Sequence, residues 1–267
     1  MARSEDDGLG VRPFLFVAGV ITLLPAALPW ACAAQTSGQV PPRASASGTG
    51  RIEGRITLSP ALSTDRMRFR PYGDFGRGQF PTERNEPANP FARVVVYIVS
   101  PTLSGYEAQE QRPPASISQS NETFDPHLLP VLRGTTVEFP NDDDIFHNVF
   151  SLSAPALFDL GRYPRGESRS VVFDDVGVVA VFCDIHSDMS ATVLVLDNPF
   201  FAQPDAEGRF LIEGLPPGDH VLTVWHDRVA PIEVAASVAA GQTTPLSIEL
   251  PPPSEQMNRP GSLWDRH

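Results

Sequence analysis

The chain has 267 residues, of which 41% are hydrophobic, so it can bury the core of one large domain or two small ones. Its formal net charge of −12 at pH 7 argues against nucleic-acid binding, which requires a basic surface. Its 28 Pro and 20 Gly residues, with few helix-forming runs, predict an all-β chain with many turns.

The first 34 residues have the pattern of a secretory signal peptide. An apolar stretch (14–28) precedes an A-x-A cleavage site at residues 31–33. The stretch is shorter than the roughly 20 residues that cross a membrane, but the acidic residues before it are atypical, so an uncleaved anchor is the alternative. We expect a mature protein that is periplasmic or secreted, with no membrane attachment unless this segment is retained. Cleavage would leave one cysteine, Cys183, which excludes an internal disulfide.

Two strands are expected before the central part of the chain. Residues 35–50 are rich in Ser, Gly, Ala and Pro, which predicts a flexible linker. Residues 51–58 alternate apolar and polar side chains like a half-buried strand, and residues 94–99 are apolar on both faces like a buried strand. Residues 59–90 show little periodicity and are expected to form a long loop.

Short strand-like runs separated by turns fill the rest of the chain. The expected strands are 115–119, 128–132, 136–139, 147–152, 170–173, 176–182, 191–196, 221–226 and 246–250. Runs of this length and spacing are typical of a β-sandwich. Residues 251–267 begin with three prolines and are expected to be a disordered tail.

Two of these runs border side chains that bind metals. Cys183, His186 and Met189 lie in the heptad CDIHSDM, and His147 lies upstream in FHNVF. Two imidazoles, a thiolate and a thioether are the ligand set of a blue-copper electron-transfer site, a trigonal His₂Cys plane with a weak axial Met. The alternative is a buried structural cysteine with incidental His and Met neighbours.

The ligand motif resembles that of the cupredoxins. The Cys-x-x-His-x-x-Met loop is most similar to the short ligand loops of amicyanin and pseudoazurin, and TTVEFPND (135–142) resembles the run that leads to the first copper histidine. The resemblance implies a Greek-key β-sandwich with one type 1 copper ion. It assigns His147, Cys183, His186 and Met189 as ligands and Asn148 as the residue that braces the Cys loop.

The ligand loop departs from the cupredoxin pattern at two positions. Ser187 and Asp188 stand where relatives often carry Pro or apolar residues. The surroundings of the site are therefore expected to be more polar than is usual in that family.

The C-terminal half resembles a different family, the carboxypeptidase-regulatory-like (transthyretin-like) β-sandwich. The resemblance is carried by DAEGRF (205–210), GLPPG (214–218) and AGQTT (240–244). That family begins with two strands, which residues 51–58 and 93–99 resemble. Chains with both patterns resemble bacterial proteins labelled methylamine-utilisation-like.

These two resemblances predict a discontinuous domain organisation. We expect a cupredoxin domain of residues 113–197 inserted in, or packed beside, a second sandwich made of residues 51–100 and 198–250. The alternative is that residues 51–99 extend the cupredoxin. Strand pairing distinguishes the two hypotheses.

The function expected from the sequence is one-electron transfer by a type 1 copper ion outside the cytoplasm. The expected partner is a redox protein, such as a basic c-type cytochrome. A copper storage or delivery protein and an interaction module with a structural copper site are the alternatives. We expect no enzyme, because no substrate need reach the metal and no Ser or Cys nucleophile with an oxyanion-type Gly motif accompanies His226, the other candidate base.

Five carboxylates lie in loops beside the predicted ligands. They are Asp142, Asp143, Asp144, Asp184 and Asp188. Their clustering would give an acidic rim on which a basic redox partner could dock. The alternative is that aspartate simply favours turns.

Overall fold

The computed structural model describes residues 48–63, 89–103, 106 and 115–253. The predicted signal peptide (1–34) lies outside these residues, as do most of the predicted linker, long loop and tail. Among the described residues, no helix has the length and apolar character needed to cross a membrane.

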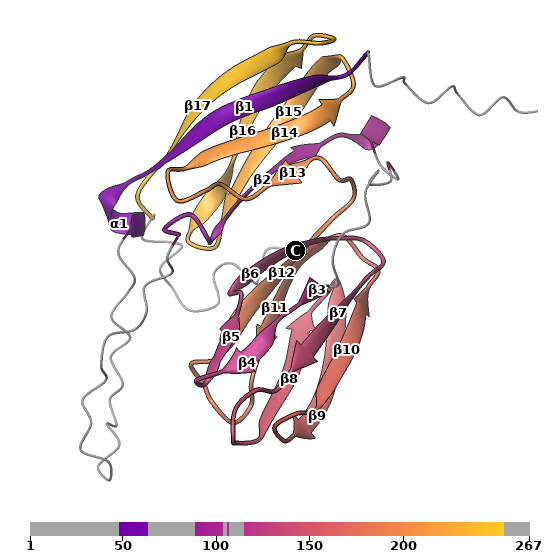
Figure 1. The fold of residues 1–267 in the computed structure, drawn as a ribbon, viewed down its shortest axis with the longest axis vertical. Coiled ribbons are helices and arrows are strands. Elements are labelled where there is room, and N and C mark those ends of the chain that lie inside the picture. The colour runs from indigo at the N-terminus through magenta and orange to yellow at the C-terminus, as the bar shows by residue number, and fades with distance from the viewer. Residues whose placement is uncertain (1–47, 64–88, 104–105, 107–114, 254–267) are drawn as a thin grey trace, which may run out of the picture. The chain divides into compact units, whose positions relative to one another are not determined.

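The described chain is all-β, apart from one short α-helix and a 3₁₀ turn (Figure 1). In chain order the elements are β1 (Gly50–Leu58), α1 (Pro60–Ser63), β2 (Val94–Val99), the 3₁₀ turn (Pro101–Leu103), β3 (Ala115–Ser116), β4 (Ser118–Ser120), β5 (Thr123–Asp125), β6 (Leu128–Leu132), β7 (Thr135–Pro140), β8 (His147–Ser153), β9 (Ala156–Tyr163), β10 (Ser168–Phe173), β11 (Gly177–Phe182), β12 (Ser190–Leu196), β13 (Phe201–Ala202), β14 (Arg209–Leu215), β15 (Gly218–His226), β16 (Val229–Val238) and β17 (Thr243–Leu250).

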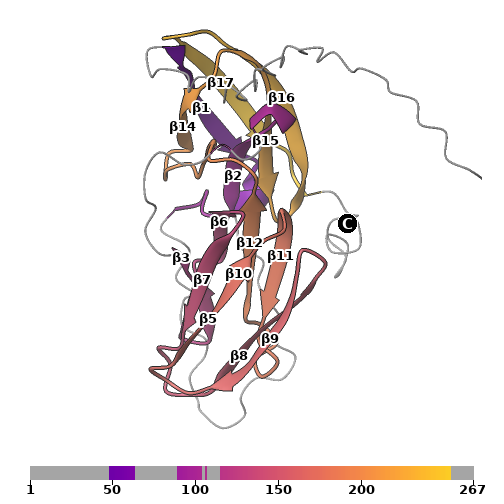
Figure 2. The same cartoon turned by 90° about the vertical axis from the view of Figure 1, so that its right-hand side faces the viewer.

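The central sandwich consists of β3 and β6–β12 in two sheets (Figure 2). One sheet has the order β6-β12-β11-β8-β9, and the other has the order β10-β7-β3. The buried core between the sheets is formed by every second side chain along the strands. Examples are Val137 and Phe139 on β7 and Val193 and Val195 on β12. Cys183 and Met189 belong to the same apolar cluster, so the loop that joins β11 to β12 is anchored in this core.

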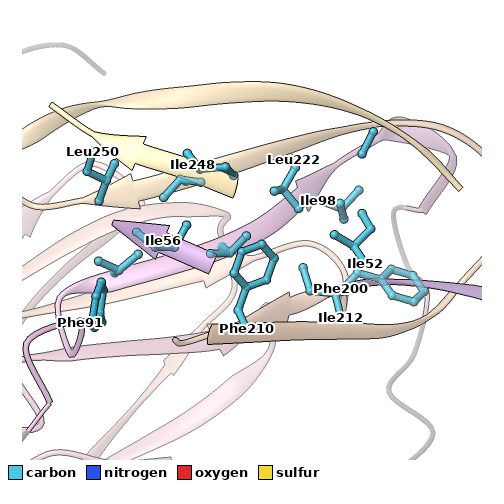
Figure 3. Packing of buried hydrophobic residues seen from close by; sticks show 14 of the residues in the cluster. Ile52, Ile56, Phe91, Ile98, Phe200, Phe210, Ile212, Leu222, Ile248 and Leu250 are labelled. Carbon is cyan, nitrogen blue, oxygen red and sulfur yellow. The ribbon is translucent and has the colours of Figure 1, made fainter. Parts of the chain in front are cut away.

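The terminal sandwich consists of the strands on either side of that segment. Its sheets have the orders β14-β1-β17 and β13-β2-β15-β16. Figure 3 shows the apolar cluster of this sandwich, with Ile52 and Ile56 of β1 packed among Ile98, Leu222 and Ile248. These side chains come from both sheets, so burial of the cluster holds the two sheets together.

Strand pairing places both early segments in the terminal sandwich. Strand β1 runs antiparallel to β14 and parallel to β17, and β2 runs antiparallel to β13 and β15. The insertion hypothesis requires these partners, because the alternative would pair β1 and β2 with strands of the central sandwich. The domain boundaries drawn from the sequence (51–100, 113–197 and 198–250) stay predictions.

Strands β5, β9, β13 and β16 are absent from the strands expected from the sequence, and each lies at a sheet edge. Strand β9 contains Gly161 and β16 contains Pro231, residues that weaken a strand pattern. Edge positions tolerate both residue types, because one side of an edge strand needs no partner. The expected strand 115–119 is split in two: β3 pairs with β7, and β4 forms a hairpin with β5.

Candidate metal centre

Three metal-ligating side chains from two separate segments converge in the central sandwich. His147 begins β8, and Cys183 and His186 follow β11. Their ligand atoms all lie within 4.8 Å of one another. The Nδ1 atoms of the two histidines are 3.0 Å apart, and the Cys183 Sγ lies 3.9 Å from Nδ1 of His147 and 3.8 Å from Nδ1 of His186.

These separations fit a single first-row metal ion. Ligand bonds of about 2.0 Å to imidazole and about 2.3 Å to thiolate place nitrogen and sulfur about 3.8 Å apart at a trigonal angle. The two sulfur–nitrogen separations match this value, and the shorter nitrogen–nitrogen separation corresponds to a narrower angle between the histidines. One ion could therefore touch all three atoms without any movement of the backbone.

Met189 completes the predicted ligand set from the end of the same loop. Strands β11 and β12 pair up to Phe182 and Ser190, so residues 183–189 form the loop that closes this hairpin. The backbone N–H of Cys183 donates to the Met189 carbonyl at 3.3 Å, and the N–H of Met189 donates to the His186 carbonyl at 3.0 Å. These bonds fold the loop back on itself and keep Met189 buried in the core cluster with Cys183.

Asn148 joins the two ligand segments. Its Oδ1 accepts a hydrogen bond from the backbone N–H of Asp184 at 2.9 Å, and its Nδ2 donates to Oδ1 of Asp159 at 2.7 Å. Asn148 is buried, whereas Asp159 is exposed, so the two bonds are only partly shielded from water. The residue after His147 is thereby tied to the residue after Cys183.

A turn organised by Asn141 positions His147 from the other side. The Nδ2 of Asn141 donates to the carbonyls of Ile145 and Tyr163, and its Oδ1 accepts the backbone N–H of Asp143. Asn141 is fully buried, so the turn from residue 141 to 145 has a fixed shape. That turn delivers His147 at the start of β8, where it pairs across the strands with Tyr163.

Tyr163 is a buried anchor beneath this turn. Its hydroxyl donates to the Phe139 carbonyl at 2.8 Å and accepts from Nε2 of Gln119 at 2.6 Å. Burial raises the pKa of Tyr163 to about 12. The phenol therefore stays neutral and keeps its role as a hydrogen-bond donor across the physiological pH range.

Asp143 lies against the imidazole of His147 rather than in open solvent. Its Oδ2 accepts a hydrogen bond from Nε2 of His147 at 2.7 Å. Burial alone would raise the pKa of Asp143, but hydrogen bonds from the Glu122 backbone, from His147 and from the Asn121 backbone outweigh burial and lower it. The carboxylate is consequently ionised at neutral pH.

Two further carboxylates of the predicted rim form ion pairs with arginine. Asp184 lies 3.0 Å from Arg162, and Asp144 contacts Arg165. Three exposed apolar side chains stand among these residues: Phe146 is 56% exposed, Ile145 41% and Ile185 40%. The surface beside the ligands is therefore a mixture of apolar groups and paired charges, less acidic than the sequence suggests.

Several residues that build this centre have no signal in the sequence. Gln119, Asn141, Tyr163 and Asp159 contribute through contacts between distant segments. Asp143 was predicted only as a member of the rim, although its position four residues before His147 brings it to the imidazole. A rule based on spacing would need the shape of the 141–145 turn, which depends on Asn141.

Comparisons with known proteins match part of the chain. A scan against protein-family models finds no match, and a search of curated proteins finds none. Among solved structures, a purple cupredoxin from Nitrosopumilus maritimus is 26% identical over 31% of this chain and 99% of its own, with a TM-score of 0.29. Amicyanin from Paracoccus versutus is 17% identical over 33% of this chain and 86% of its own, with a TM-score of 0.30.

A copper-containing nitrite reductase from Thermus scotoductus also matches. It is 27% identical over 34% of this chain, with a TM-score of 0.30, and only 24% of its own length is covered. At such TM-scores these likenesses establish no family or activity for the chain.

One prediction is corrected by this comparison. The sequence led us to expect that the chain is no enzyme, but the matched structures include a nitrite reductase beside the cupredoxins. That expectation is therefore wrong as stated.

Proposed function

We propose that this chain is a type 1 copper protein that carries one electron between redox partners outside the cytoplasm. The observation that carries the proposal is the convergence of the Cys183 thiol with Nδ1 of His147 and of His186, all within 4.8 Å. Soft sulfur and imidazole together suit copper in both of its common oxidation states. Copper bound here would supply a one-electron couple.

The chain contributes a fixed arrangement of donors. His147 is fully buried, Cys183 is 5% exposed, and Met189 is 1% exposed, so these side chains are held by packing. Asn148 and the folded ligand loop hold the two segments at a constant separation. Rigid donors keep the reorganisation on electron transfer small, because the ligands need not move when the metal changes charge.

His186 is the ligand that lies nearest to solvent, since it is the half-buried member of the three. We propose that electrons pass to a partner at this edge, beside the exposed Ile145, Phe146 and Ile185. A basic redox protein such as a c-type cytochrome would meet apolar contacts there, with Asp142, Asp143, Asp144, Asp184 and Asp188 around them. Burial of apolar surface gives affinity, and surface charge mainly sets the association rate.

Copper storage or delivery would use the same four side chains. Deep burial of His147, Cys183 and Met189 favours the electron carrier, because delivery requires ligands that a receiving protein can reach and replace. An interaction role for the terminal sandwich would be separate from the copper site.

Voltammetry of the copper-loaded protein, with the metal content measured before and after, tests the proposal. We expect repeated one-electron cycles with full retention of copper. Loss of copper on reduction, or transfer of Cu(I) to a competing chelator within the time of a cycle, would replace electron transfer with copper delivery.

A further inference from the structure

The carboxylate of Asp143 is held in place on three sides. Its Oδ1 accepts the backbone N–H of Asn121 at 2.6 Å, and its Oδ2 accepts the backbone N–H of Glu122 at 2.9 Å. The Asp143 backbone is fixed in turn by Asn141. The remaining direction of Oδ2 is filled by Nε2 of His147, at 2.7 Å.

The two N–H groups come from a strained turn. Asn121 and Glu122 connect β4 to β5, and both have positive φ angles, 54° and 56°. A two-residue hairpin of this kind favours Asn followed by Gly, so Glu at the second position is unfavourable. A strained conformation persists where its surroundings determine it, and here the surroundings include the Asp143 carboxylate.

We infer that Asp143 is a positioning residue for His147: it fixes the histidine tautomer and places a negative charge against the metal centre. A carboxylate only accepts hydrogen bonds, so Nε2 must carry the ring proton. The lone pair is then left on Nδ1, the atom that faces Cys183 and His186. This inference rests on the proposed copper function.

The charge of Asp143 should also affect copper affinity and the reduction potential. A carboxylate that accepts the N–H of a ligating imidazole makes that imidazole a stronger donor. A stronger donor stabilises Cu(II) more than Cu(I), because the more highly charged ion gains more from it. Removing the charge should therefore weaken Cu(II) binding selectively and raise the reduction potential.

The test compares Asp143→Asn with Asp142→Asn, which makes the same change of charge at an exposed side chain one residue away. For Asp143→Asn we expect Cu(II) binding about 10–100-fold weaker. Each tenfold selective loss of Cu(II) affinity raises the potential by about 59 mV. For Asp142→Asn we expect a much smaller change. Equal potentials and equal affinities in the two variants would overturn the inference while leaving the copper function intact.

A second measurement uses the metal-free wild-type protein, so it does not depend on the folding of a variant. In the metal-free wild-type protein, ¹⁵N NMR of His147 above pH 8 reports which ring nitrogen carries the proton. We expect the proton on Nε2, and a proton on Nδ1 would overturn the inference. Failure of the wild-type protein to bind copper would overturn the proposed function and this inference together, and is recognised by the wild-type titration alone.

Discussion

Oδ1 of Asn148 accepts the backbone N–H of Asp184 at 2.9 Å, which joins the residue after His147 to the residue after Cys183. His147 begins β8 and Cys183 directly follows β11, and these two strands are neighbours in the sheet. Strand pairing between them is sparse near the site, with Phe182 paired to Phe150. The Asn148 side chain therefore provides the direct connection between the ligand segments that the backbone ladder does not.

Replacing Asn148 tests this connection. Asn148→Ala leaves the Asp184 N–H without its buried acceptor, which costs about 1–3 kcal/mol. We expect a loss of that size in the free energy of unfolding, measured by denaturant titration, and faster loss of copper to a chelator. Asp159→Ala is the matched control, because it removes the acceptor of the Asn148 Nδ2 and leaves the bond to the Asp184 N–H in place. If the control destabilises as much as Asn148→Ala, the bond to Asp184 is not the important one.

We predict that glycine at position 122, in the turn that binds the Asp143 carboxylate, does not destabilise the protein. The positive φ angle of Glu122 destabilises the folded state by about 1–2 kcal/mol. This cost exceeds the roughly 0.5–1 kcal/mol of conformational entropy that a glycine at this position would lose on folding. Glu122→Gly should therefore leave stability unchanged or raise it by up to about 1 kcal/mol in thermal or denaturant unfolding. The backbone N–H to Asp143 remains, so the copper potential should not move. A shift in potential would mean that the Glu122 side chain, and not its backbone, acts on the site.

We predict that the terminal sandwich loses stability in mild acid, because its buried His226 resists protonation. Burial lowers the pKa of His226 to about 4, although the nearby Asp227 acts in the opposite direction. The unfolded chain takes up a proton near pH 6.5 and the folded chain does not, so the stabilisation present above pH 6.5 is lost as the pH falls towards 4. The difference is on the order of 3 kcal/mol. In His226→Asn this part of the pH dependence of unfolding should disappear, and parallel curves for the two proteins would refute it.

The ion pairs beside the ligands predict how salt affects partner binding. Arg165 pairs with Asp144, so Arg165→Ala should expose an unbalanced carboxylate at the proposed docking surface. We expect faster electron transfer to a basic c-type cytochrome at low salt, with a steeper decline as salt is added. Arg133→Ala is the control, since Arg133 is exposed and pairs with the half-buried Asp197, which follows the end of β12 opposite to the loop of residues 183–189. Equal effects of the two variants would argue against docking at this surface.

The sequence was sufficient for the fold class, and it singled out the three side chains that the structure brings together, His147, Cys183 and His186. The reasons are local. Alternating apolar residues mark β7 and β12, and the CDIHSDM heptad carries three chemically distinctive side chains within one loop. In the structure, His147 lies close to the other two of these side chains, Cys183 and His186. Metal-binding residue types are rare enough in such spacing for the pattern to be informative.

What the sequence could not predict depends on contacts between distant segments. Asp143 was expected at a docking rim, but the β4–β5 turn supplies two N–H groups that draw its carboxylate towards His147. Asp184 pairs with Arg162 on β9, and Asp144 pairs with Arg165 just after that strand. Strand β9 was not expected from the sequence, because Gly161 interrupts its strand pattern. Neither arrangement follows from residue type or periodicity, because each depends on which loops the fold brings together.

The visible and electron paramagnetic resonance spectra of the purified protein with added Cu(II), beside Cys183→Ala, test the central claim most directly. We predict an intense thiolate-to-copper absorption band and a narrow copper hyperfine splitting in the wild-type protein, both lost in the variant. A wild-type protein that binds no Cu(II), or spectra that do not change when the Cys183 sulfur is removed, would contradict the assignment of a type 1 copper centre.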